Sequence, residues 1–180
     1  MNKIYPPEKF YYGDLLYIED YDVFCHSDLG NEIQNAIRSQ LTDIICQFDF
    51  GFQDGGCLML AKALEKWSNN NLELYYIANG RIPDIVQHVV ACYKDKIFID
   101  SDGIGSERDF LKKSDLLEAI IEPQMKKIEE NTNLSGIVND ENYINYLVSN
   151  LEAKLGMFEK LQFEEILSNS TELPLRRGIK

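Results

Sequence analysis

Residues 52–67 read FQDGGCLMLAKALEKW and predict a helix that begins abruptly after a two-glycine turn. Cys57 is the first residue of this helix, and Gly55 and Gly56 come directly before it. Apolar side chains cover much of the helix circumference, at Leu58, Leu60, Ala61, Leu64 and Trp67. A helix that is apolar on most sides is normally buried, so we expect this one to lie at the centre of the fold.

Three segments precede this helix. Residues 1–28 are rich in aromatic and acidic side chains and predict an irregular or short-helical segment that wraps the core. Residues 31–48 predict one helix, because apolar side chains recur there at spacings of three and four residues. Residues 49–56 contain several glycines and predict a loop.

Strands follow the central helix. Runs of apolar and β-branched residues predict strands over 72–78, 86–93 and 96–100, with a tight turn at Lys94-Asp95 between the last two. Residues 101–105 contain two glycines and predict an exit loop. The sequence therefore predicts a small antiparallel sheet against which the central helix packs.

The remainder of the chain predicts helices. Their expected ranges are 109–113, 114–130 with an interruption at Pro123, 141–155 and 157–167. Helices, then antiparallel strands, then more helices define an α+β protein. We expect a catalytic core over 1–105 and a helical extension over 106–180 that packs on it.

Composition narrows the classes of partner. The chain has 180 residues, 44% of them hydrophobic, which is enough for one domain with its own core. Its formal net charge is −12, so we expect no direct binding to nucleic acid or to anionic membranes. Glu19, Asp20 and Asp22 lie in a region without Lys or Arg. This acidic region is either a solvated surface or a docking face for a basic protein partner.

The N-terminus lacks the apolar core of a signal peptide, and no window approaches the length of a membrane span. We expect a cytoplasmic protein, with signal-independent export left open. Without a signal, the four cysteines (Cys25, Cys46, Cys57 and Cys92) are expected to be free thiols. Only two histidines are present, so the usual ligand spacing of a zinc site is absent.

Cys57 has the position of a reactive thiol. A helix N-terminus stabilises a thiolate through its unpaired N–H groups and its macrodipole. Gly55 and Gly56 would permit a close approach and leave space for a substrate backbone. The N–H of Cys57 could hold an oxyanion. The alternative is that Cys57 is a small buried hydrophobic residue.

His88 and Asp100 are the expected partners of this thiol. His88 lies on a predicted strand, where it could take the thiol proton, and its competitor His26 follows Cys25 in an acidic loop. The predicted turn places His88 opposite residues near 100 or 101, so Asp100 could orient the imidazole. Asp102 is the second candidate for this role.

Two glutamines complete the set of candidates. Gln53 lies four residues before Cys57, where its amide could complete an oxyanion hole or belong to an ordinary loop. Gln87, beside His88, is a candidate polar group for binding substrate.

Cysteine at a helix start, then strand histidine, then strand aspartate is an order that resembles the papain-like cysteine hydrolase superfamily. The matching residues are Gly55-Gly56-Cys57, Gln87-His88-Val89-Val90 and the stretch 98–103. Small toxin and effector members look closest, and transglutaminase-like enzymes and bacteriocin-processing peptidases share the order. The resemblance covers residues 45–105. Position 51 is glycine, where many papain-like proteases carry a glutamine six residues before the nucleophile.

The resemblance implies a papain-like core and a thiol hydrolase or acyl transferase that needs no metal or organic cofactor. Its substrate would be a protein or peptide amide, in a peptidase, deamidase or transglutaminase reaction, and the protein would be a bacterial or phage effector. Two alternatives remain: an acidic inhibitor or immunity-type protein without enzymatic activity, and a papain-like domain that has lost catalysis.

Overall fold

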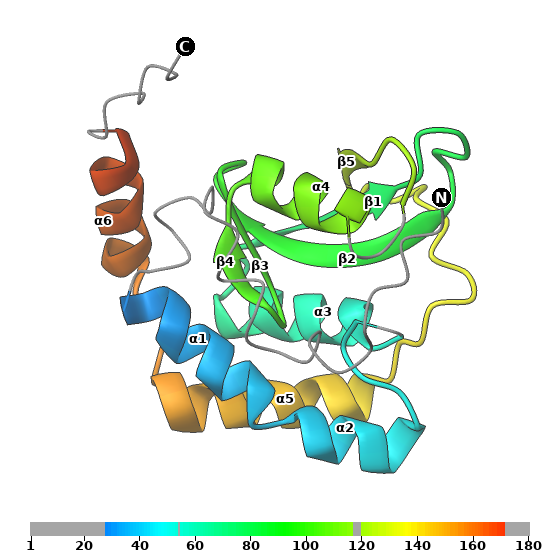
Figure 1. The fold of residues 1–180 in the computed structure, drawn as a ribbon. Coiled ribbons are helices and arrows are strands. Elements are labelled where there is room, and N and C mark those ends of the chain that lie inside the picture. Colours follow the sequence, from blue (N-terminus) through cyan, green and yellow to red (C-terminus); the bar gives the residue numbers. More distant parts are fainter. Residues whose placement is uncertain (1–27, 54, 117–119, 172–180) are drawn as a thin grey trace.

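A computed structural model of the chain describes residues 28–53, 55–116 and 120–171. In these ranges helices lie on both faces of one sheet (Figure 1). The elements in chain order are α1 (Asp28–Arg38), α2 (Leu41–Phe48), α3 (Cys57–Trp67), β1 (Glu73–Ala78), β2 (Val86–Tyr93), β3 (Ile97–Asp100), β4 (Gly103–Gly105), α4 (Glu107–Leu116), β5 (Gln124–Lys127), α5 (Glu141–Leu155) and α6 (Lys160–Thr171).

The sheet has five antiparallel strands in the order β4-β3-β2-β1-β5. The α4 helix covers one face of this sheet, and α3 covers the other (Figure 1). On its far side α3 packs against α5, and α1 contacts both α5 and β4. The protein is therefore a mixed α and β fold with α3 between the sheet and the other helices, and the predicted α+β class is confirmed at this level.

The central helix has the predicted bounds and the predicted burial. Its buried residues extend from Cys57 at the first turn to Trp67 at the last. The Trp67 indole N–H donates a hydrogen bond of 2.9 Å to the carbonyl of Gly156, which follows α5. Leu60 and Leu64 share one apolar cluster with Leu147 and Leu151 of α5. The helical region after residue 106 thus contributes to the core that holds α3.

The prediction of one helix over 31–48 is wrong, because the chain turns at Ser39 and Gln40 between α1 and α2. The Ser39 hydroxyl donates to the carbonyl of Ala36 at 2.6 Å, and Gln40 N–H donates to Ile37 at 2.9 Å. These bonds compete with the helical pattern and end α1. The break directs α2 toward the loop that precedes Cys57.

The predicted helix over 114–130 is also wrong after Leu116, because residues 124–127 form the edge strand β5. These residues pair with β1, with Met125 opposite Ile77 and Lys127 opposite Tyr75. Pro123 directly before β5 disfavours a continuing helix, as expected, and the open edge of β1 supplies partners for the backbone groups. The region 106–180 therefore contains a strand of the sheet as well as helices.

Residues 101–105 were predicted as a loop, yet Gly103–Gly105 form strand β4. Asp100 pairs with Gly103, so Ser101 and Asp102 make the turn of a tight hairpin. The N–H of Asp102 donates to Asp100 Oδ1 at 2.7 Å, a side-chain bond that stabilises such a turn. Asp100 and Asp102 consequently lie next to each other at one end of the sheet.

Candidate active site

The three candidate catalytic residues lie on three buried elements. Cys57 is the first residue of α3, His88 lies in β2, and Asp100 ends β3. Their side chains are shielded from solvent, with exposures of 7% for Cys57, 2% for His88 and 1% for Asp100. A histidine and an aspartate buried to this degree require partners for their polar atoms.

The register of β2 and β3 puts His88 and Asp100 on one face of the sheet. The β2–β3 turn spans Lys94 to Lys96, one residue longer than predicted, and Tyr93 pairs with Ile97. Lys94 and Asp95 have φ values of 51° and 56°, which a turn of this length requires. Side chains alternate along each strand, so a register shifted by one residue would place Asp100 on the opposite face.

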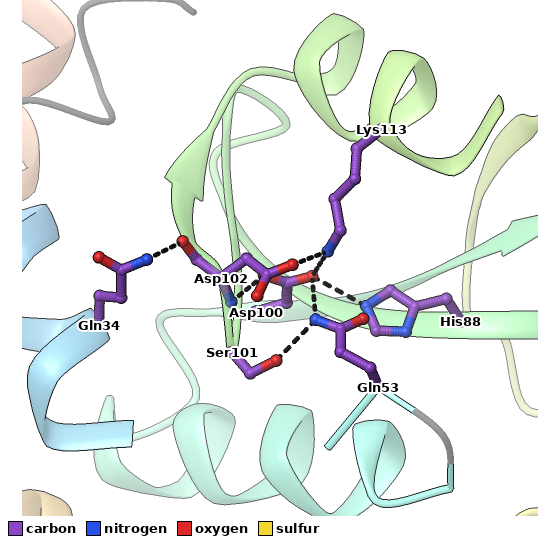
Figure 2. Close-up of polar contacts among 7 residues, drawn as sticks. All are labelled: Gln34, Gln53, His88, Asp100, Ser101, Asp102 and Lys113. Carbon is purple, nitrogen blue, oxygen red and sulfur yellow. Dashed lines mark hydrogen bonds and ion pairs between the residues drawn. The ribbon is translucent and has the colours of Figure 1, made fainter. Parts of the chain in front are cut away.

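His88 is held by Asp100. His88 Nε2 lies 3.0 Å from Asp100 Oδ2, and dashed lines in Figure 2 mark this contact. Burial alone would lower the pKa of His88, but its interactions with Asp100 and Cys57 outweigh burial and raise that pKa to about 10. These interactions favour the charged form of the imidazole at neutral pH.

Cys57 is the second partner of His88. Burial alone would raise the pKa of the Cys57 thiol, but the interaction with His88 and with the N–H groups of Val89 and Leu58 lowers it below the usual value. The second ring nitrogen of His88, Nδ1, is buried and forms no ordinary hydrogen bond within the part of the chain that the structure describes. The electrostatics of the site favour a thiolate–imidazolium pair.

Asp100 has more than one partner, as Figure 2 shows. The Lys113 ammonium donates to Asp100 Oδ2 at 2.6 Å, and the Gln53 amide nitrogen approaches the same oxygen at 3.3 Å. Burial disfavours a charged carboxylate, but Lys113 and His88 keep the pKa of Asp100 well below its usual range. Asp100 is therefore a fixed negative charge behind His88.

Lys113 was not among the residues predicted for the site. It projects from α4, is only 5% exposed, and also pairs with Asp102 Oδ2 at 2.7 Å. The available signal was its helical position, because Lys113 lies three residues after the apolar Phe110 and therefore on the same face of α4. A lysine on the buried side of a helix requires an anionic partner.

Asp102 joins this network at its edge. Burial and the neighbouring Asp100 raise its pKa, and Lys113 opposes them. The Gln34 side chain of α1 donates to the backbone carbonyl of Asp102 (Figure 2). Two further helices, α1 and α4, therefore hold the hairpin that carries both aspartates.

Gln53 lies near the site, although its amide is directed at Asp100 and Ser101. Its nitrogen donates to Ser101 Oγ at 2.6 Å, and its oxygen is buried without a hydrogen-bond partner among the described residues. In this arrangement the amide nitrogen is occupied, so Gln53 supports Asp100 and has no free N–H for an oxyanion. Gln87 is exposed, and its side chain forms no hydrogen bond to a residue of the site among the described residues.

The two glycines before Cys57 accommodate the core. A Cβ atom on Gly56 would lie 2.5 Å from Ile44 Cδ1, and one on Gly55 would lie 3.0 Å from the Phe50 ring. Gly56 N–H also donates to Gly51 O at 2.9 Å. The space that we expected for a substrate backbone is, at Gly56, filled by Ile44 and Gly51.

Other candidates lie apart from this site. Cys46 is exposed, and Cys92 is buried on β2 with a pKa that burial raises. Cys25, His26 and the acidic residues 19–22 lie outside the described residues. In the described ranges no group of three or more His, Cys, Asp or Glu side chains could hold a metal ion. No described helix is long and apolar enough to cross a membrane.

Comparisons of this chain with known protein families, with curated proteins and with solved structures found no match. The class of the site therefore rests on its own residues: a buried imidazole that contacts a buried carboxylate, a lysine that pairs with the same carboxylate, and a buried thiol whose pKa the imidazole lowers.

Proposed function

We propose that the protein is a papain-like thiol enzyme that breaks an amide bond, or transfers its acyl group, with Cys57 as the nucleophile. The observation that carries this proposal is that Cys57 begins α3 beside His88, whose imidazole Asp100 holds at 3.0 Å. The interaction of Cys57 with His88 lowers the pKa of the thiol and contributes to the raised pKa of the imidazole. A thiolate is the reactive form of cysteine, so this pairing is what nucleophilic catalysis requires.

In the first step, Cys57 Sγ attacks the carbonyl carbon of the amide and forms a tetrahedral intermediate. His88 gives its proton to the nitrogen of the leaving group, the carbon–nitrogen bond breaks, and an amine departs. A thioester then joins the acyl group to Cys57. Asp100 stabilises and orients the imidazole throughout, at 3.0 Å from Nε2.

In the second step, neutral His88 takes a proton from water or from an acceptor amine, which attacks the thioester. Water releases a carboxylic acid, whereas an amine forms a new amide, and either path regenerates the thiolate and the imidazolium. A peptide bond gives a peptidase, and a glutamine side-chain amide gives a deamidase or a transglutaminase. This mechanism requires no metal or organic cofactor.

The start of α3 supports the oxyanion. The first N–H groups of an α-helix have no acceptor within the helix, and that of Cys57 lies beside its own thiol. Removal of one oxyanion-hole donor from a protease costs about 3 to 4 kcal/mol. Since the Gln53 amide nitrogen is occupied, we assign this role to the helix start.

The arrangement of elements supports the papain-like assignment. A nucleophile helix packs on an antiparallel sheet, and the histidine and aspartate lie on adjacent strands of that sheet. The partners that we infer are a protein or peptide substrate in the cytoplasm. The alternative of an acidic binding protein depends on the cluster Glu19, Asp20 and Asp22, which lies outside the described residues.

The rate of iodoacetamide labelling, followed by mass spectrometry at each cysteine, tests the proposal. We expect Cys57 to label faster than the exposed Cys46 at about pH 6, where an ordinary thiol is almost wholly protonated. Cys92, which is fully buried, serves as the unreactive reference. The His88→Ala variant should lose the advantage of Cys57. Labelling of Cys57 that is slow and indifferent to His88 would favour the binding protein.

Product analysis then identifies the reaction. Incubation with a mixed peptide library that contains glutamine and free amines distinguishes cleaved peptides, glutamate products and new amide links by mass. All products should be missing with Cys57→Ala. An activated Cys57 that gives no product with any of these substrates would favour a domain that has lost catalysis.

A further inference from the structure

Lys113 has surroundings that an ordinary surface lysine does not have. Its side chain is 6% exposed, and its ammonium approaches the Phe110 ring to 5.6 Å. Burial of an ammonium group costs several kcal/mol unless charges and hydrogen bonds compensate it. The compensation comes from two carboxylates on the β3–β4 hairpin.

These two carboxylates have different positions relative to His88. Lys113 Nζ lies 2.6 Å from Asp100 Oδ2, which is the oxygen that His88 Nε2 approaches at 3.0 Å. Lys113 Nζ also lies 2.7 Å from Asp102 Oδ2, and this oxygen has no hydrogen bond to His88 within the described residues. Two cations therefore share one oxygen of Asp100, as Figure 2 shows.

The orientation of Asp100 does not depend on Lys113 alone. Asp100 Oδ1 accepts from the N–H of Asp102 at 2.7 Å, a bond within the hairpin turn. Gln53 also approaches Oδ2, at 3.3 Å. Lys113 therefore adds charge at a carboxylate that the backbone already holds, and its main effect on His88 is electrostatic.

We propose that Lys113 is a positioning residue that regulates proton transfer by His88, because it shares Asp100 with the imidazolium and so limits how tightly the carboxylate holds the His88 proton. This inference rests on the proposed function. His88 must give its proton to the leaving amine, and an imidazolium held by an unshared buried carboxylate would be a poor acid.

The charged groups that face His88 come from several elements. Cys57 belongs to α3, Asp100 to β3, Asp102 to the hairpin turn and Lys113 to α4. Lys113 opposes protonation of His88, whereas the aspartates and the thiolate favour it. Removal of the Lys113 charge should consequently raise the pKa of His88, whereas removal of the Asp102 charge should lower it.

The test is an NMR titration of His88 in a Cys57→Ala background, where the thiol no longer contributes. His26→Gln assigns the two histidine signals. We expect Lys113→Met to raise the pKa of His88 by about one unit or more, the size that Coulomb's law gives for the loss of a charge at close range in a protein. Lys113→Arg, which keeps the charge, should shift it much less. Asp102→Asn should lower it.

If Lys113 had only a structural role, Lys113→Met and Asp102→Asn would not shift the pKa of His88 in opposite directions. Circular dichroism first establishes which variants fold, and Asp102→Asn decides the matter if Lys113→Met does not fold. An unchanged pKa of His88 in the folded variants would overturn the inference. Labelling of wild-type Cys57 separates the two proposals. An unreactive Cys57 would contradict the proposed function. A reactive Cys57 together with an unchanged pKa of His88 would contradict only the role of Lys113.

Discussion

His88 Nε2 and Asp100 Oδ2 lie 3.0 Å apart, although the two residues are not directly opposite each other in the sheet. Ala91 pairs with Ile99, so continued pairing would place Asp100 across from Val90, with His88 two residues further along β2. Side chains two residues apart share a face, and a diagonal contact of this kind is within reach of an imidazole. The turn at 94–96 sets the register of β2 and β3 and therefore determines which carboxylate contacts His88.

Asp100→Asn should weaken the activation of Cys57. The amide keeps the shape of the carboxyl group but not its charge, so burial will lower the pKa of His88 and the thiolate will lose its cation. We expect labelling of Cys57 at about pH 6 to slow by roughly tenfold for each unit that the thiol pKa rises. Asp115→Asn, an exposed change on α4, is the control. Equal labelling rates in the two variants would contradict the role of Asp100.

Stability should depend on pH differently with and without Cys57. The pKa of His88 rises to about 10 on folding, so its contribution is full below about 6.5, its unfolded value, and is lost as the pH rises through 10. The pKa of Cys57 is lowered on folding, so its contribution is full above about 8.5 and is lost as the pH falls. Between these unfolded values the two contributions change with pH in opposite directions, so the ionisation of Cys57 offsets part of the loss at His88.

Cys57→Ala removes only the thiol side of this balance. The free energy of unfolding should then fall with pH more steeply than in wild type between roughly pH 6.5 and 8.5, by up to about 1.4 kcal/mol per pH unit. Urea unfolding at a series of pH values measures both slopes. Cys46→Ala, at an exposed position, should retain the wild-type slope. Parallel curves for wild type and Cys57→Ala would show that no ion pair forms.

Local patterns predicted the centre of the fold well. The bounds of α3, β2 and α5 agree with the predicted ranges, because each has a strong period and clear boundaries in the sequence. The break at Ser39 and Gln40 and the strand β5 were missed. Both depend on partners far away in the sequence or on side-chain bonds to the backbone, which periodicity does not record.

The sequence was enough to predict the three candidate catalytic residues and their order along the chain, but not the residues that hold them in place. Cys57, His88 and Asp100 could be chosen by residue type and by the element that carries each. Lys113 and Ser101 could not, because a lysine in a polar helix and a serine in a turn usually face water. The bond from Gln53 to Ser101 requires the loop before α3 to reach the end of β3, which no local pattern indicates.

Gly56→Ala should destabilise the protein and displace Cys57. The new Cβ would lie 2.5 Å from Ile44 Cδ1, and Ile44 is fully buried, so its side chain would have to shift within the packed core. Overpacking of this kind costs about 1 to 3 kcal/mol. Ile44→Val removes the clashing methyl group, so the double variant should recover part of the loss. Chemical denaturation of the wild type, the two single variants and the double variant gives the coupling free energy between the two positions. Purely additive losses of stability would contradict the clash.

Leu147→Ala tests whether α5 belongs to the core that holds the nucleophile helix. Leu147 is 1% exposed in the cluster that contains Leu60 and Leu64 of α3, and loss of such a side chain costs about 2 to 5 kcal/mol. Leu161→Ala is the matched control, because Leu161 is 81% exposed and the same change should stay within about 0.5 kcal/mol. Urea denaturation measures both. Similar small losses would mean that α3 is held by the sheet alone. A large loss only at Leu147 would mean that the position of Cys57 depends on residues far outside the stretch 45–105, which carries the three candidate catalytic residues.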